Sequence, residues 1–418
     1  MSITRRPFQN MTPTMWRNLA LAAILIAYLA EMGLDVAWGN ICGHLGADYC
    51  AFWSAGHIAN NFGYREIYNL DLLSQIQKSN FPTFGDPSFF AVAPIAYLPV
   101  FILPFQLLAY LSPAQGFFIW AFLNIAVLIY YLRYFIAKTT QNKLATRLLL
   151  MMVLSLPVYW NLLNGQVNLW LMICVGEFFR ASIDNKPFRA GLWLAGLLLK
   201  PQLLIFIIPA LLLQRSYKTI SAWMASSALL GGISILLIGA SGWENLFRVW
   251  LGFSKGMATN DVEVMMNWRM LGTHLAILLS QNVGWTIAGI GILFTIGAVF
   301  YLWRKRIPLQ SLSYSKAMLG TLAATCLVAW HSHIHTAMIL IPVLIFLNYC
   351  ENSLPKNLVE WWVFLPTSIY FVSTILASFA GIPANDMPTV LRYPLYFARG
   401  FSEMGFNFYI LVWTIKQL

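Results

Sequence analysis

The chain has 418 residues, of which 59% are hydrophobic and only 10% are charged. This composition excludes an ordinary soluble protein and is typical of a multi-pass membrane protein. The net charge of +11 does not indicate a nucleic-acid partner, because excess lysine and arginine in membrane proteins mark cytoplasmic loops. We therefore expect one all-α integral membrane domain over residues 1–418, in the inner (plasma) membrane.

The first apolar run, Leu19 to Leu34, follows Arg5, Arg6 and Arg17, so the N-terminus is predicted to be cytoplasmic. Polar residues rather than a cleavage site end the run, so we expect a first transmembrane helix and not a removable signal. The chain then enters a large first outer loop, about residues 35–113, which is expected to carry surface helices.

The segment from Phe90 to Leu111 is apolar, but Pro94, Pro99 and Pro104 would break a membrane helix repeatedly. If this segment crossed the membrane, a basic group on the far side of the next span would lie outside, against the usual charge bias. That group consists of Arg133, Lys138, Lys143 and Arg147. We therefore expect the segment to lie along the outer surface.

Two short spans, Leu148–Leu163 and Val167–Phe179, are joined by Asn164-Gly165-Gln166, which predicts a tight outer turn. The segment Ala190–Leu213 has basic residues at both ends, so it must enter and leave the membrane on one side. It has only about 24 residues where two crossings need about 40. A break at Lys200-Pro201 would solve this, and Lys200 would then need an anionic partner at membrane depth.

The rest of the chain alternates spans with polar loops. The expected spans are Ile220–Ala240, Val283–Trp303, Lys316–Trp330, Thr336–Tyr349, Trp361–Ala380 and Met404–Trp413. A second outer region covers about residues 241–282, and a third outer loop covers Gly381–Phe401. This gives about twelve crossings, with both termini cytoplasmic.

Polar residues gather at the predicted outer turns around a single carboxylate, Asp48. The candidate substrate-binding residues are His57, Asn164, Gln166, Lys200, Arg269, His331 and His335. Cations that converge on one carboxylate suit a phosphorylated lipid: Lys and Arg hold phosphate, and Asp takes a proton from an attacking hydroxyl. The alternatives are that Asp48 only caps a surface helix and that Lys200 only snorkels to the interface.

Cysteines and histidines give no metal prediction. Cys42 and Cys50 share the first outer loop, where a disulfide and two free thiols are both open, since spacing does not fix geometry. His331 and His335 would share one face of a helix, but zinc sites usually show three or four ligands with recognisable spacing. Proton handling or phosphate contact is preferred, and neither a metal nor a cofactor is expected.

Four blocks of sequence resemble glycosyltransferase family 87 through their order and spacing. They are ADYCAFWSAG (47–56) with Gly63 and Ile67-Tyr68, the proline-rich 93–99, NGQVNLW (164–170) and RAGLWLAGLLLKPQLL (189–204). The resemblance extends over about the first 220 residues, with the remainder similar only in hydropathy. The stretch Met266–His274 departs from the family's polar second-loop motif, and the chain is on the short side.

The resemblance implies a GT-C membrane fold and an inverting transfer of a hexose, commonly mannose, from a polyprenyl-phosphate sugar. The acceptor would be a lipid or glycan at the outer face of the membrane, and Asp48 would be the general base. One alternative is a transporter or flippase for a lipid-linked or anionic solute, which predicts repeated broken helices in two halves. Another is a non-catalytic scaffold of an envelope-assembly complex, in which replacing Asp48 by Ala would have no effect.

Overall fold

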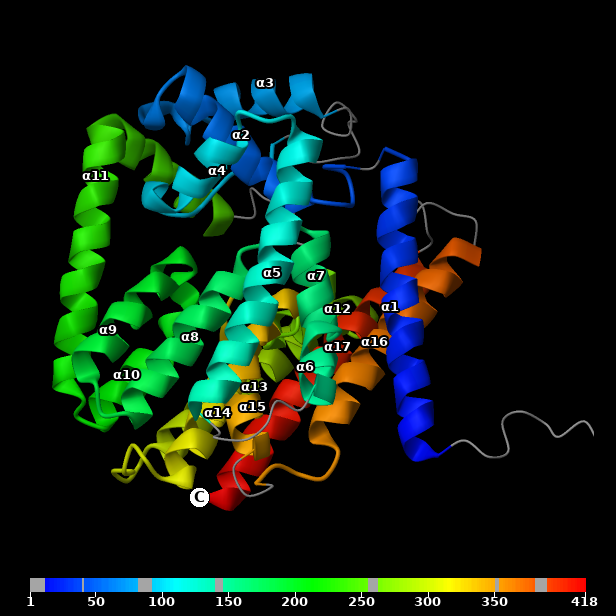
Figure 1. The fold of residues 1–418 in the computed structure, drawn as a ribbon, viewed down its shortest axis with the longest axis vertical. Helices are drawn as coiled ribbons and strands as arrows, with labels where there is room; N and C mark the ends of the chain where they lie inside the picture. Colours follow the sequence, from blue (N-terminus) through cyan, green and yellow to red (C-terminus); the bar gives the residue numbers. More distant parts are fainter. Residues whose placement is uncertain are drawn as a thin grey trace, which may run out of the picture.

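The computed structural model describes residues 12–39, 41–81, 92–139, 146–254, 262–349, 353–379 and 389–418. Within these ranges every regular element is a helix, and strand-like pairing is limited to two isolated bridges. The predicted all-α class is confirmed. Figure 1 shows a helical body with a layer of shorter helices lying across one end.

The described residues contain five helices that are long and apolar enough to cross a membrane, and the bent pair α6 and α7 is a sixth candidate. These helices are α1 (Pro13–Ala37), α5 (Pro113–Thr139), α11 (Tyr217–Ser254), α13 (Gln281–Leu302) and α16 (Leu358–Phe379). The chain is thus a multi-pass membrane protein. The count of about twelve crossings stays a prediction, because many other apolar helices are short.

The last helix, α17 (Thr389–Gln417), is also long. The remaining elements are α2 (Ala47–Asn61), η1 (Tyr64–Glu66), α3 (Leu70–Asn80), η3 (Pro99–Ile102), α4 (Leu103–Leu108), α6 (Thr146–Val153), α7 (Leu156–Leu163), α8 (Asn168–Ile183), α9 (Pro187–Ala195), η4 (Gly196–Leu199), η5 (Pro201–Leu204), α10 (Ile207–Leu213), η6 (Val262–Val264), α12 (Trp268–Leu278), α14 (Leu312–Val328), η7 (Ile334–Leu340) and α15 (Ile341–Tyr349). The η elements are 3₁₀ helices.

The layer across the end of the body is formed by α2, α3 and α4 (Figure 1). Prolines stand in the first turns of η3 and α4, so the apolar segment before α5 folds as two short helices rather than one span. The Trp53 indole donates to the Leu111 carbonyl at 3.0 Å, and Gly56 lets α2 touch the α4 backbone at Phe105. The described part of the predicted surface segment therefore lies on this layer.

Ion pairs show that several helix starts lie at the same end of the body. Glu360 at the start of α16 accepts from Arg17 of α1 at 2.9 Å and from Arg147 of α6 at 3.2 Å. If the segment before α5 were a full crossing, Arg147 would be expected at the opposite end from Arg17. The ion pairs therefore agree with the charge argument that placed this segment along the surface.

The broken hairpin is confirmed. The helical run of α9 and η4 ends at Lys200, whose backbone is not helical (φ −137°, ψ 80°), and η5 and α10 lead back. At the base of the hairpin, Gln214 donates to the Lys305 carbonyl at 2.9 Å and accepts from the Ile307 amide at 2.8 Å. These bonds bring the hairpin base to the basic loop that follows α13.

Two predicted outer regions are more helical than expected. The element α11 extends past Ala240 to Ser254, but Gly239 has a non-helical conformation (φ 62°, ψ −172°), so α11 consists of two helices joined at a kink. The described part of the loop predicted at Gly381–Phe401 belongs to α17. Gly400 lets this helix approach the Met265 backbone closely.

Candidate functional site

A cavity of about 610 Å³ lies between the α2 layer, the α7–α8 turn, the tip of the broken hairpin and the loop before η7. Among the described residues that line it, Asp48 is the one carboxylate and Lys200 the one lysine. The other predicted site residues on its wall are Asn164, Gln166, His331 and His335. The structure thus brings together six of the eight site residues expected from the sequence.

Local backbone geometry fixes Asp48 at the edge of the cavity. The helix α2 begins after Gly46, which takes the N-cap position with a positive φ of 76°. The Gly46 amide donates to the Leu163 carbonyl at 2.6 Å, and the Tyr49 amide donates to the Asn164 carbonyl at 3.0 Å. Asp48 is therefore not the N-cap, and the alternative that it serves only as a cap is contradicted.

The open question about the first outer loop is answered by a disulfide between Cys42 and Cys50, whose Cα atoms lie 5.6 Å apart. Cys50 belongs to the first turn of α2, next to Asp48. The bond closes a short loop over Gly46, and the Cys42 amide also donates to the Leu45 carbonyl at 2.8 Å. The loop that leads into α2, and so to Asp48, is therefore restrained by a covalent bond.

Three side chains form a hydrogen-bonded chain across the cavity wall. The Gln166 amide nitrogen donates to Asp48 Oδ2 at 2.6 Å, and Lys200 Nζ donates to Gln166 Oε1 at 3.2 Å. Lys200 also donates to Asn168 Oδ1 at 3.2 Å. Lys200 is only 7% exposed, so the anionic partner that its burial requires is supplied by Asp48 through Gln166.

The turn between α7 and α8 is held from several directions. Gly165 has a φ of 67°, which glycine adopts without steric cost, and its carbonyl accepts from the Trp120 indole at 2.9 Å. The backbone N–H of Gln166 donates to the backbone carbonyl of Asn161 at 2.8 Å. The backbone N–H of Asn168 donates to the side-chain oxygen Oδ1 of Asn161 at 2.9 Å. The predicted tight turn is confirmed, and it presents a fixed Gln166.

Burial and the neighbouring charges have opposite effects on the pKa values of Asp48 and Lys200, the two ionisable side chains of this hydrogen-bonded series. Both lie outside the described helices that are long enough to cross a membrane. Burial raises the pKa of Asp48 above its ordinary value, while the Gln166 hydrogen bond and the Lys200 charge lower it. Burial lowers the pKa of Lys200 to about 8, against the opposing charge of Asp48. At neutral pH the Lys200 ammonium therefore stands near a carboxyl group of raised basicity.

The three histidines do not lie on an α-helix. His333 precedes the 3₁₀ helix η7, and its ring lies 5.6 Å from each of the His331 and His335 rings. Burial lowers the pKa of His331 to about 4 and of His333 to about 3, so both are neutral at pH 7. Among the described residues no group of His, Cys, Asp or Glu could hold a metal ion.

Two predicted site residues lie away from the cavity wall. His57 stacks on Trp53, with ring centroids 5.0 Å apart, within α2. The Arg269 guanidinium lies 4.2 Å from the centroid of the Trp330 ring, and Trp330 itself lines the cavity. Arg269 therefore supports a wall residue rather than forming the wall.

Several lining residues were not identified from the sequence. These are Phe52, Tyr97, Trp160, Gln202, Trp250, Trp330 and His333. The aromatic members come from five separate parts of the chain, and aromatic residues are also common at membrane interfaces, so composition could not distinguish them. Flat apolar rings beside polar groups suit a sugar, which offers both C–H faces and hydroxyl groups.

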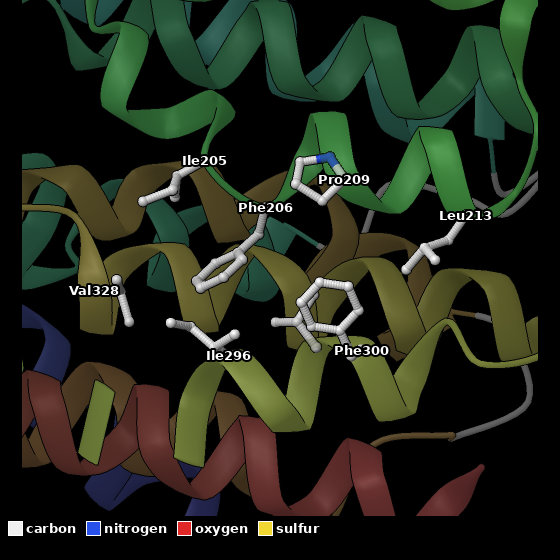
Figure 2. Close-up of a pocket in the computed structure, with 8 residues that line it drawn as sticks. Ile205, Phe206, Pro209, Leu213, Ile296, Phe300 and Val328 are labelled. Carbon is white, nitrogen blue, oxygen red and sulfur yellow. The ribbon is translucent and has the colours of Figure 1, made fainter. Parts of the chain in front are cut away.

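A second, smaller pocket of about 190 Å³ is lined entirely by apolar residues. Figure 2 shows Ile205, Phe206 and Pro209 from the hairpin facing Ile296, Phe300 and Val328. Its lining residues stand near those of the polar cavity in the sequence: Gln202 precedes Ile205 by three positions, and Trp330 follows Val328 by two.

The fold and the cavity define a multi-pass membrane protein with a half-buried carboxyl group and a buried lysine on one cavity wall, and with a separate apolar pocket. The family model of glycosyltransferase family 87 matches residues 96–330, more than half of the chain, and the protein belongs to this family. The matched stretch extends beyond residue 220 but does not include the Asp48 block. No curated protein and no solved structure matches the chain.

Proposed function

We propose that this membrane glycosyltransferase moves a hexose, most simply mannose, from a polyprenyl-phosphate donor to a hydroxyl of a lipid or glycan acceptor. The observation that carries this proposal is the Asp48–Gln166–Lys200 chain on one cavity wall. A carboxylate that accepts a proton and an ammonium that holds phosphate are the two groups such a transfer needs.

The reaction balances with these groups alone. The acceptor hydroxyl loses its proton to the Asp48 carboxylate as its oxygen attacks the anomeric carbon. The bond between that carbon and the phosphate oxygen breaks, and the electron pair leaves with the polyprenyl phosphate. Attack opposite the leaving group inverts the anomeric configuration. The leaving phosphate is already anionic and is stabilised by Lys200, so no general acid is needed.

The neutral histidines and the aromatic walls suit the sugar rather than the phosphate. His335 is only 4% exposed, lines the cavity, and has a buried Nδ1 without a hydrogen-bond partner. An unpaired buried ring nitrogen is costly and is best satisfied by a ligand hydroxyl. Together with His331 and Asn164, it would orient the sugar above Lys200.

The apolar pocket supports a lipid-linked donor. We expect the prenyl chain to lie against Phe206 and Ile296, with its phosphate at Lys200. The chain enters the pocket from lipid rather than from water, so each added prenyl carbon contributes only packing contacts of about 0.1–0.2 kcal/mol per atom pair. The donor KM should therefore fall as the chain is lengthened over the length of the pocket. A membrane assay with a panel of radiolabelled polyprenyl-phosphate hexoses of different chain lengths measures this.

The activity itself is tested with purified protein and a panel of polyprenyl-phosphate sugars that differ in the hexose and have one chain length. Transfer from polyprenyl-phosphate mannose is the expected result. Transfer only from a nucleotide sugar would contradict the proposed donor class. Binding of the lipid donor without turnover, combined with its movement between leaflets, would favour a transporter instead.

The cavity is proposed to open on the extracytoplasmic side, with both termini in the cytoplasm, because the hairpin base and the loop after α13 are basic. Single cysteines at exposed positions test this with a membrane-impermeant thiol reagent. Cysteines replacing Phe62 or Lys78 on the α2–α3 layer should be labelled in intact cells. Cysteines replacing Lys186 or Lys305 should be labelled only after the membrane is opened; the reverse pattern would invert the topology.

A further inference from the structure

The side chain of Gln166 has no remaining capacity for a substrate. Its amide nitrogen donates to Asp48 at 2.6 Å, and the side chain also forms a hydrogen bond with Tyr97. Its carbonyl oxygen accepts from Lys200 at 3.2 Å and from the Val167 amide at 3.3 Å. A glutamine amide offers two donors and two acceptor sites, so all four are used.

The chemistry of the neighbours also fixes which way the amide points. A carboxylate can only accept, so the Gln166 nitrogen must face Asp48. An ammonium can only donate, so the oxygen must face Lys200. Turning the amide over would place acceptor against acceptor and donor against donor. Because the side chain is only 7% exposed, water does not compensate for such a mismatch.

We propose that Gln166 is a positioning residue which orients Asp48 as the base and couples it to Lys200, rather than a residue that binds substrate. This inference rests on the proposed function, in which Asp48 removes the acceptor proton and Lys200 holds the donor phosphate. The amide holds Oδ2, which leaves the other carboxylate oxygen of Asp48 for the acceptor hydroxyl. A charge-assisted hydrogen bond of this kind favours the ionised carboxylate.

The coupling has a direction. The positive charge of Lys200 polarises the side-chain amide of Gln166. The hydrogen bond from this amide to Asp48 becomes stronger as a result, because hydrogen bonds in a chain strengthen one another. Binding of an anionic phosphate to Lys200 compensates the ammonium charge, so the basicity of Asp48 rises when the donor is in place. The other titratable groups that line the cavity with Asp48 are Lys200, Tyr97 and the three histidines His331, His333 and His335. Only Lys200 among them is charged at neutral pH.

The test is the pH profile of kcat/KM for two variants, Gln166→Leu and Gln166→Glu. Transfer needs ionised Asp48, so the rate falls as pH falls through the pKa of that carboxyl. Losing the hydrogen bond raises this pKa, and the acid limb should move up by about one to two pH units in Gln166→Leu. Gln166→Glu adds a second carboxyl beside the first and should move the limb further.

The variant Asn168→Ala is the matched control. Asn168 contacts Lys200 as Gln166 does but is hydrogen-bonded to neither oxygen of Asp48, so its removal should raise the donor KM and leave the acid limb in place. An unmoved acid limb in Gln166→Leu, together with a raised KM, would overturn the proposal and return Gln166 to substrate binding.

A double-mutant cycle with Asp48→Asn gives a second readout that depends less on folding, since both variants are compared in one background. If Gln166 acts only through Asp48, Gln166→Leu should cost nothing further in the slow residual transfer of Asp48→Asn. If the double variant shows the product of the two single-variant losses in transfer rate, the proposal is contradicted. Near-normal transfer by Asp48→Asn alone would instead contradict the proposed function, so the two failures are distinguishable.

Discussion

Asp48→Asn is expected to slow glycosyl transfer at least about a hundredfold, because a positioned general base contributes roughly a hundred- to ten-thousand-fold in rate. Asparagine keeps the size of the side chain and can still meet Gln166, but it cannot take the acceptor proton. The protein should insert normally and bind the lipid donor as before. Single-turnover transfer, with donor binding measured in parallel, gives both quantities.

Asp71→Asn is the matched control for this change. Asp71 belongs to the same layer, at the first turn of α3, and is exposed, so the same loss of charge occurs away from the cavity and transfer should stay normal. Transfer by Asp48→Asn at a near-normal rate would remove Asp48 from the mechanism.

Lys200→Met is expected to weaken donor binding about 10- to 100-fold, since a hydrogen bond to a charged group contributes about 1.5–3 kcal/mol and 1.4 kcal/mol is a factor of ten. Methionine has a similar length and is apolar, so it should fill the buried site, with a loss of stability of about 1–3 kcal/mol because the Gln166 and Asn168 oxygens lose a donor. Donor KM and direct binding of the lipid donor measure the effect. Lys78→Met, on the exposed end of α3, is the control and should not change either quantity.

The pH dependence provides a further check on Lys200. Its pKa is lowered to about 8 by burial, so the ammonium is present below that pH and is lost above it. Donor binding should therefore decrease as pH rises through about 8 in the native protein. In Lys200→Met this alkaline decrease should be absent. Unchanged donor affinity in the variant would mean that Lys200 only anchors the hairpin at the interface.

Several features could be predicted from the sequence because they depend on the backbone preferences of single residues. Proline spacing predicted that the segment before α5 would not form one long helix, and Lys200-Pro201 marked the break in the hairpin. The glycine in Asn164-Gly165-Gln166 predicted the turn between α7 and α8. These predictions rest on backbone restrictions of single residues, which operate wherever the residue stands in the fold.

The ends of the outer regions were predicted less well. The second outer region was predicted to begin at about residue 241 and the third to cover Gly381–Phe401. In the structure, α11 extends across a kink at Gly239 to Ser254, and α17 already begins at Thr389. A glycine can kink a helix, or let it touch another backbone, without ending it. Which of these happens depends on the packing neighbours, and the sequence around the glycine does not name them.

By itself, the sequence determined a helical membrane protein, its basic loops and the hairpin break, and it selected Asp48 and Lys200, which the structure places on one cavity wall. Only the tertiary structure decided that Asp48 and Lys200 meet through Gln166, that His57 faces Trp53, and that Arg269 stands behind Trp330. Hydropathy and charge act on each segment separately, so they are visible along the chain. The site depends on contacts between separate segments, such as Asp48 and Gln166, which are 118 positions apart, and such contacts are set by packing.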